Sequence, residues 1–179
     1  MLLTIKEMEV RALPFAGTWE PGIVDFTGSG AIQKSALYAE GVAELLSGSD
    51  EDVRVKGQVR TELETECDRC LGRASFKIDT PFDLFYKPAS KAATDAEVAI
   101  DEDDAEIGFY ELPGLELEQI LAEQVLLQLP MQRVCSETCK GICPVCGANR
   151  NENDCQCEPA PIHGKTSDDR WNALKGVKV

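Results

Sequence analysis

The sequence predicts an α+β protein, in which a mainly antiparallel β-sheet with a long hairpin and one covering helix is followed by a cysteine-rich C-terminal module. Three observations predict it. Apolar and polar residues alternate over 53–65 and again over 74–86, which is typical of half-buried strands. An apolar stripe at helical spacing lies between 115 and 129. The eight cysteines fall in only two places, at 67–70 and within 135–157.

The first half of the chain is predicted to be mostly strands. Residues 2–10 alternate weakly and predict an opening strand, whereas the Gly- and Pro-rich stretch 14–30 predicts mostly loop. Apolar residues occupy alternate positions over 37–45 and predict a strand, with a helix over 36–46 as the alternative. The two alternating runs that follow predict an antiparallel hairpin with the sequence CDRCLG at its tip.

The segment 87–111 interrupts this pattern and is predicted to be an acidic loop. Between 87 and 130 there are 2 basic and 11 acidic residues, a balance of −9. A solvated loop is the plain interpretation of such a charge block, and the alternatives are docking of a basic protein along 95–106 or mimicry of nucleic-acid charge. Pro113 and Pro130 then bracket the helix 115–129, which we expect to cover one face of the sheet.

These elements divide the chain into three parts. We expect a β-rich core domain at 1–130, a cysteine-rich module at 131–160 and a tail at 161–179. In the tail, Ser167 followed by Asp168 and Asp169 favours the start of a short helix.

The composition fits a folded protein in a reducing compartment. With 43% hydrophobic residues the 179-residue chain can bury a core, and its net charge of −14 repels free nucleic acid and anionic membranes in general. Lys6, Glu7, Glu9 and Arg11 fall where a signal peptide needs an apolar core, and no apolar stretch reaches the ~20 residues of a spanning helix. We therefore expect a cytoplasmic protein without a membrane partner, whose cysteines bind metal rather than form disulfides.

The cysteine spacing predicts zinc. Cys143-Pro-Val-Cys146-Gly147 is typical of a zinc knuckle, and a polar loop returns Cys155 and Cys157 to complete four thiolate ligands. The remaining pairs suggest a second zinc site, made by these four cysteines: Cys67, Cys70, Cys135 and Cys139. The competing arrangement is one zinc within 135–157 and a redox-active CxxC at 67–70. A hairpin turn does not stabilise a thiolate as a helix N-terminus does, which disfavours redox chemistry.

Catalysis has little support in the sequence. His163 is the only histidine, no phosphate-binding glycine motif is present, and a zinc with four thiolates leaves no open position for water. We therefore predict a structural zinc module, no enzymatic activity and no small-molecule substrate. With zinc assigned to the cysteine-rich part, the predicted fold class is α+β with a C-terminal zinc-binding module.

RNA contact is predicted from two local basic patches. Residues 131–150 carry three basic residues against Glu137, and 163–179 carry four against two acidic ones, a balance of +2 in each case. Ordinary surface is the alternative interpretation. The candidate RNA-binding residues are Arg133, Lys140, Arg150, Lys165, Arg170, Trp171 and Lys175.

From about residue 37 onward the sequence resembles the YceD family of large ribosomal RNA subunit accumulation proteins. The resemblance rests on the CDRCL sequence at 67–71, the acidic middle, the helix ending in LQLP at 127–130, and KGICPVCG at 140–147. It also includes the CQC sequence at 155–157 and the DDRWNAL sequence of the tail, with Asp169 where the family pattern usually has Pro.

The resemblance implies a non-enzymatic role in the synthesis, processing or stability of 23S ribosomal RNA, with that RNA or a pre-ribosomal particle as partner. Some family members lack the GxCPxCG cysteines but keep CxRC and a metal-capable pair near 135–139, which implies pairing of 67/70 with 135/139. Two alternatives from other classes remain: an acidic adaptor for a basic ribosomal protein, and a redox- or metal-sensing CxxC protein.

Overall fold

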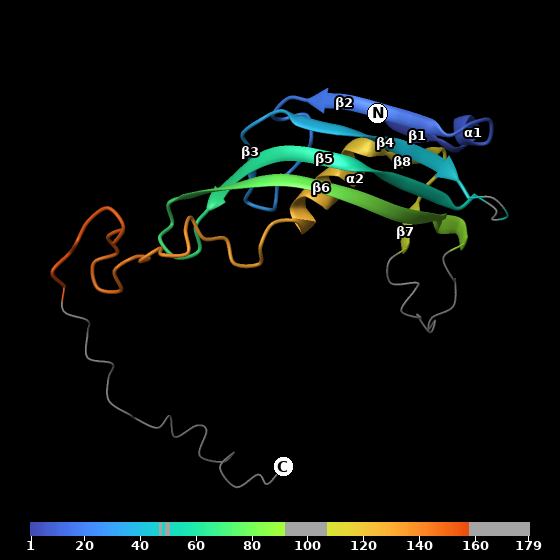
Figure 1. Cartoon of the computed structure of the whole chain (residues 1–179). Coiled ribbons are helices and arrows are strands. Elements are labelled where there is room, and N and C mark those ends of the chain that lie inside the picture. The colour runs from blue at the N-terminus through green and yellow to red at the C-terminus, as the bar shows by residue number, and fades with distance from the viewer. Residues whose placement is uncertain (47, 49–50, 92–106, 158–179) are drawn as a thin grey trace, which may run out of the picture.

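The computed structural model describes residues 1–46, 48, 51–91 and 107–157 (Figure 1). Within these residues the main sheet has six strands in the order β2-β4-β5-β6-β7, with β3 paired to β5. The chain is mostly β-sheet, as predicted. Three predicted features lie outside the described residues: the acidic stretch 95–106, His163 and the short helix from Ser167.

The centre of the sheet is a long hairpin. β5 (Val53–Glu66) and β6 (Arg73–Pro88) pair antiparallel from Val53↔Tyr86 to Glu66↔Arg73. β4 (Leu37–Leu45) pairs antiparallel with β5, so the strand prediction for 37–45 is confirmed and the helix alternative is wrong. The alternating apolar side chains of β5 are buried, which places them between the sheet and the helix below it.

Four residues in register form a transverse row across this sheet. Phe15 lies opposite Gly41, Gly41 opposite Gly57, and Gly57 opposite Phe82. The two aromatic rings cover the two glycines, because a Cβ at Gly41 would lie 2.6 Å from Cζ of Phe15 and one at Gly57 would lie 3.0 Å from Cζ of Phe82. The glycines therefore leave the space that the rings fill.

The N-terminal region differs from the prediction. The strand expected over 2–10 ends early: β1 (Leu2–Thr4) is followed by a short helix, α1 (Ile5–Met8), which buries Ile5 and Met8. The loop expected over 14–30 was predicted to begin too early, because the whole of β2 (Leu13–Trp19) is a strand that pairs with β4 from Trp19↔Leu37 to Leu13↔Ala43. Pro14 is tolerated there because β2 is an edge strand. β3 (Ile32–Gln33) adds a short pairing with β5.

The sheet is mixed, because its far edge pairs in parallel. β7 (Ile107–Tyr110) runs parallel to β6 in the register Phe85↔Ile107, so the last residues of the predicted acidic loop are a strand. A 3₁₀ turn, η1 (Ala89–Lys91), ends β6. β8 (Gly114–Glu116) pairs with β1 and leads directly into the second helix.

This second helix, α2 (Leu117–Leu127), covers one face of the sheet (Figure 1). Its buried residues are Leu117, Ile120, Leu121 and Val125, four members of the predicted stripe. The chain thus has two helices in its described part where we expected one covering helix, since α1 was not foreseen. Neither is long and apolar enough to cross a membrane.

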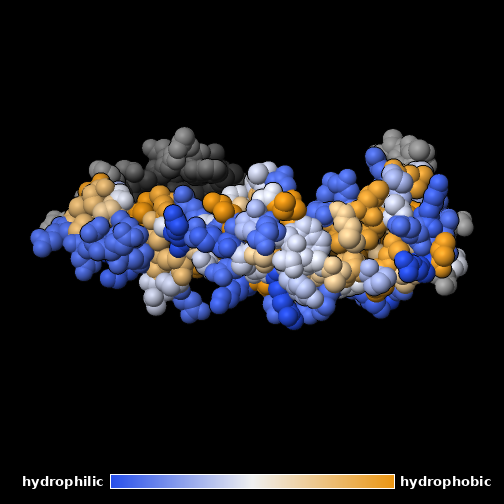
Figure 2. Space-filling model, turned by 90° about the horizontal axis from the view of Figure 1, so that it is seen from above, coloured by the Kyte–Doolittle hydropathy of each residue, from blue (hydrophilic) through white to orange (hydrophobic). Residues whose placement is uncertain are grey.

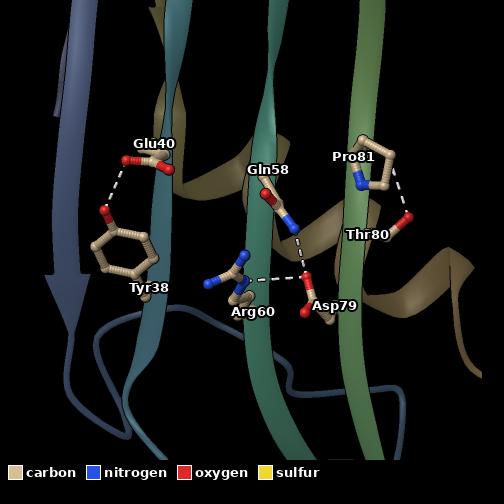
Figure 3. A network of polar contacts seen from close by, with 7 residues as sticks. All are labelled: Tyr38, Glu40, Gln58, Arg60, Asp79, Thr80 and Pro81. Atoms are coloured by element: carbon tan, nitrogen blue, oxygen red, sulfur yellow. Dashed lines mark hydrogen bonds and ion pairs between the residues drawn. The ribbon is translucent and has the colours of Figure 1, made fainter.

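The other face of the sheet is polar. In Figure 3 the α2 ribbon passes behind the strands, while Tyr38 donates to Glu40, and Gln58 and Arg60 both donate to Asp79 on the near side. Seen from above in Figure 2, hydrophilic side chains interrupt the hydrophobic ones along the length of an elongated body. The hydrophobic core therefore lies between the sheet and its helices.

Candidate metal centre

The tip of the β5–β6 hairpin and residues 131–139 together form a cluster of four thiols. The sulfur atoms of Cys67, Cys70, Cys135 and Cys139 all lie within 4.8 Å of one another. Sγ of Cys67 is 3.9 Å from Sγ of Cys139, and Sγ of Cys70 is 3.7 Å from Sγ of Cys135. Two segments far apart in the sequence thus supply two thiols each, at one end of the molecule (Figure 1). We call this the first quartet.

The local turn presents the two hairpin thiols to the same point. The N–H of Cys67 donates to the carbonyl of Gly72 and the N–H of Leu71 donates to the carbonyl of Cys67, which closes a tight turn across the strand ends. Leu71 takes φ = 59°, the left-handed conformation that lets the chain turn back. Cys67 is 0% exposed, so its sulfur lies in the interior of the cluster.

Backbone contacts fasten this tip to the C-terminal module. The N–H of Asp68 donates to the carbonyl of Arg133 at 2.8 Å, and the N–H of Arg133 donates to Oδ2 of Asp68 at 2.6 Å. Further along, the N–H of Ile142 donates to the carbonyl of Arg69 at 2.9 Å. A Cβ at Gly141 would lie 3.0 Å from this same carbonyl, and Gly141 takes φ = 72°. The quartet thus spans the domain boundary that we predict at residue 130.

A second quartet lies within the C-terminal module. The sulfur atoms of Cys143, Cys146, Cys155 and Cys157 also lie within 4.8 Å of one another. The N–H of Gly147 donates to the carbonyl of Cys143, and Gly147 takes φ = 72°, so the predicted knuckle turn is present. An isolated bridge between Ile142 and Asn149 frames it.

Backbone N–H groups aim at the sulfurs and favour the thiolate form. Burial alone would raise the pKa of the Cys67 thiol, but N–H groups of Cys70, Arg69 and Cys135 donate to its sulfur and lower that pKa to about 6. N–H groups of Cys146 and Val145 likewise lower the pKa of Cys143 to about 6. Such N–H donors are what a thiolate bound to a metal requires.

In each quartet a neighbouring cysteine opposes ionisation of another thiol. The side chain of Cys139 raises the pKa of Cys135 to about 12, and that of Cys146 raises the pKa of Cys157 to about 12. Four sulfurs at this distance cannot all ionise without a cation among them. Each quartet is therefore a site that a divalent metal would complete.

The spacing of the sulfurs fits a tetrahedral metal. With metal–sulfur bonds of about 2.3 Å, a tetrahedral zinc separates its sulfur ligands by about 3.8 Å. The first quartet contains distances of 3.7 and 3.9 Å. Both clusters could therefore hold a metal ion on four cysteine ligands, with the members predicted from the sequence.

Asn151 connects the two quartets, and the sequence analysis did not single it out as a site residue. This residue lies in the polar loop of the second quartet, yet its Nδ2 donates to Sγ of Cys139 in the first at 3.3 Å. Its Oδ1 accepts from the N–H of Lys140 at 2.8 Å. The bond from Asn151 is the largest influence on the Cys139 thiol and lowers its pKa. The three asparagines between Cys146 and Cys155 were the only signal in the sequence.

The seven predicted RNA-binding residues differ in their exposure and in whether the structure describes them. Arg133 is half-buried, and its Nη1 donates to the carbonyl of Ser29 at 2.6 Å. Lys140 and Arg150 are exposed on the module, where Nζ of Lys140 lies 3.7 Å from Oδ1 of Asp154. Four candidates lie outside the described residues: Lys165, Arg170, Trp171 and Lys175. RNA contact by any of the seven stays a prediction.

Comparison with curated proteins finds uncharacterized mycobacterial proteins and a maize protein named for ribosomal RNA accumulation. An uncharacterized protein of Mycobacterium bovis is 34% identical over 146 residues, which is 81% of this chain and 61% of the relative; one from Mycobacterium tuberculosis gives the same values. A maize chloroplast protein named large ribosomal RNA subunit accumulation protein YCED homolog 1 is 26% identical over 148 residues, 70% of this chain and 48% of the relative. The chain thus spans 61% and 48% of the lengths of these relatives.

Comparison with solved structures finds no significant match. The family model described as "Large ribosomal RNA subunit accumulation protein YceD" matches residues 55–178. This range begins within β5 and includes all eight cysteines of the two quartets. The resemblance stated from the sequence is therefore confirmed, and the chain belongs to the YceD family of large ribosomal RNA subunit accumulation proteins.

Proposed function

We propose that this protein is a ribosome biogenesis factor that supports the synthesis, processing or stability of 23S ribosomal RNA and holds two structural zinc ions. One observation carries the proposal: the cysteines that mark the family resemblance also form the two quartets. The maize relative's name, which refers to accumulation of large-subunit ribosomal RNA, supports the RNA part. We place the protein in the cytoplasm, with this RNA or a pre-ribosomal particle as its partner.

Zinc is the metal that we assign to both quartets, because it favours four tetrahedral thiolates. Cys67, Cys70, Cys135 and Cys139 would hold one ion, and the four cysteines from Cys143 to Cys157 the other. A fully ligated zinc supplies structure and no open position for chemistry, so we propose no enzymatic activity. The competing redox role of Cys67 and Cys70 is less well supported, since both sulfurs have partners from the other segment.

Metal analysis and thiol titration of the purified chain test the zinc assignment. We expect two zinc ions per chain and no thiol that reacts before the metal is removed. One zinc per chain together with reactive thiols that include Cys67 and Cys70 would instead support the redox alternative.

Zinc would hold the module that presents Lys140 and Arg150 to RNA. Cross-linking in cells, followed by sequencing of the bound RNA, tests this. The double substitution Lys140→Ala/Arg150→Ala should reduce cross-linking to 23S ribosomal RNA several-fold. The matched control is Lys6→Ala/Arg11→Ala, which removes the same charge from exposed positions near α1. Equal cross-linking by both double variants would overturn the RNA contact at these residues.

A further inference from the structure

A hollowed surface lies along α2, apart from the two quartets. A cavity of about 450 Å³ lies between α2, β7 and β8, and another of about 670 Å³ lies between α2 and residues 23–25. Glu116, Gln119 and Glu123 line both cavities, so the two are contiguous along the helix. We call their combined lining the α2 surface.

Large apolar side chains are exposed on both halves of the α2 surface. In the first cavity Phe109 is 56% exposed and Leu112 is 68% exposed. In the second, Ile23 is 62% exposed and Leu127 is 67% exposed. Exposed apolar groups gathered around a hollow mark interaction sites more often than apolar groups scattered singly.

The charge of the α2 surface has one sign. Among the described residues that line the two cavities there is no lysine or arginine. The acidic residues of the lining are Asp25, Glu111, Glu116, Glu118 and Glu123. Four of these are exposed, while Glu118 is paired with the N-terminal ammonium of Met1 and accepts a hydrogen bond from Nε1 of Trp19 at 3.1 Å. An occupant must therefore offer both apolar groups and positive charge.

We propose that the α2 surface binds a basic segment of a partner protein, whose apolar side chains enter the two cavities while its lysines or arginines face the acidic rim. α2 has eleven residues, a length of about 16 Å, which a basic amphipathic helix of similar length matches. The inference goes beyond the proposed function, since it needs neither zinc nor RNA contact.

The same charge argues against the other occupants. RNA and anionic lipid would meet four exposed carboxylates and no lysine or arginine among the described lining residues, the fifth carboxylate, Glu118, being paired with the N-terminal ammonium. A second copy of this chain carries the same net charge of −14 and would bring an acidic surface against an acidic surface. A basic polypeptide is the occupant whose charge complements the lining.

Fluorescence anisotropy with a labelled 14-residue peptide of leucine and lysine, patterned as an amphipathic helix, tests the proposal on the full chain. Glu123→Lys and Leu127→Ser should each weaken binding about tenfold, through loss of charge attraction and of apolar burial respectively. The matched controls are Glu66→Lys and Val10→Ser, at exposed positions outside both cavities, and they should change the affinity less than about twofold. Amide chemical shifts that change along 117–127 would confirm the location.

Three results would overturn the proposal. The first is equal weakening by Glu66→Lys and Glu123→Lys, together with no effect of Leu127→Ser, which would indicate attraction by net charge alone. The second is self-association in sedimentation experiments that Leu127→Ser abolishes, which would make a second copy the occupant. The third is binding of an RNA oligonucleotide in competition with the peptide. Zinc content and 23S cross-linking, measured on the same variants, separate this proposal from the proposed function.

Discussion

The Sγ atoms of Cys70 and Cys135 lie 3.7 Å apart although the two residues are separated by 65 positions in the sequence. The segment between them contains β6, β7, β8 and α2, which is much of the sheet and its covering helix. A metal at the first quartet would therefore close a long loop and restrict the unfolded chain, as a cross-link does. The second quartet closes only a local loop between Cys143 and Cys157.

This difference predicts unequal effects of two matched substitutions. Cys135 and Cys157 are both exposed, and each belongs to one quartet. Cys135→Ser should lose one zinc and lower the melting temperature of the sheet clearly, because the hairpin tip is then released from the module. Cys157→Ser should also lose one zinc but leave the melting of the sheet nearly unchanged. Metal analysis and thermal unfolding followed by circular dichroism measure both effects.

The outcome that would contradict this is an equal change in melting temperature for the two variants. In that case the first quartet would not couple the sheet to the module. A melting temperature that stays constant on chelation of both metals would lead to the same conclusion.

The hydrogen bond from Asn151 to Cys139 leads to a prediction about zinc affinity. Asn151→Ala removes the hydrogen bond from Nδ2 to Sγ of Cys139, and loss of such a partner of a metal ligand typically costs about tenfold or more in affinity. Competition with a chromophoric chelator should show one zinc released more readily than in the wild type. Asn153→Ala is the matched control, because Asn153 is an exposed loop neighbour without a described side-chain contact to sulfur. Equal release from both variants would refute the role of Asn151.

Much of the fold could be predicted where one face of a strand is buried. The side chains of β5 alternate between interior and surface, so Val55, Val59 and Leu63 give a period-two signal that burial confirms. β2 gave no such signal, because Pro14 and Gly17 suggest a loop, and the strand forms through its pairing with β4. β7 likewise depends on parallel pairing with β6, which short local patterns do not encode.

In the metal centre too, local sequence patterns predicted one part, whereas the other part depends on how distant segments fold together. Spacing alone predicts the members of the second quartet, because its knuckle and its returning pair lie within 15 residues of sequence, from Cys143 to Cys157. The first quartet needed an argument from the number of unpaired cysteines and from the family resemblance. The role of Asn151 was not predicted, because its contact to Cys139 depends on how the polar loop of the second quartet folds back on the first quartet.

Gly41 predicts a stability effect within the sheet. A Cβ at Gly41 would lie 2.3 Å from the carbonyl oxygen of Lys56 and 2.6 Å from Cζ of Phe15. Gly41→Ala should therefore lower the free energy of unfolding by about 1–3 kcal/mol, because the backbone of β5 must shift. Urea unfolding measures this. Glu40→Ala, at the exposed neighbouring position, is the control and should change stability by less than about 0.5 kcal/mol. A Gly41→Ala variant as stable as the wild type would contradict the close packing at this row.

The ion pair between Arg54 and Asp83 predicts a pH dependence with a definite sign. Nε and Nη2 of Arg54 donate to the two carboxylate oxygens of Asp83 at 2.8 and 2.6 Å, and these bonds hold the pKa of Asp83 below its ordinary 3.8. Since the unfolded chain binds that proton more tightly, the pair stabilises the fold fully above about pH 4. Its contribution is lost as the pH falls through the lowered pKa of Asp83. Because both side chains are partly exposed, we expect no more than about 1 kcal/mol.

An NMR titration of the Asp83 carboxyl carbon in the folded protein checks this directly. Arg54→Ala should raise the pKa of Asp83 towards 3.8, because both hydrogen bonds and the positive charge are removed together. Arg54→Lys should give an intermediate pKa, since lysine keeps the charge but cannot donate from two planar N–H groups. If the pKa of Asp83 is the same in the wild type and in Arg54→Ala, the pair makes no contribution in solution. The stability difference between the two proteins should then also be independent of pH, whereas our prediction requires it to shrink as the solution is acidified below pH 4.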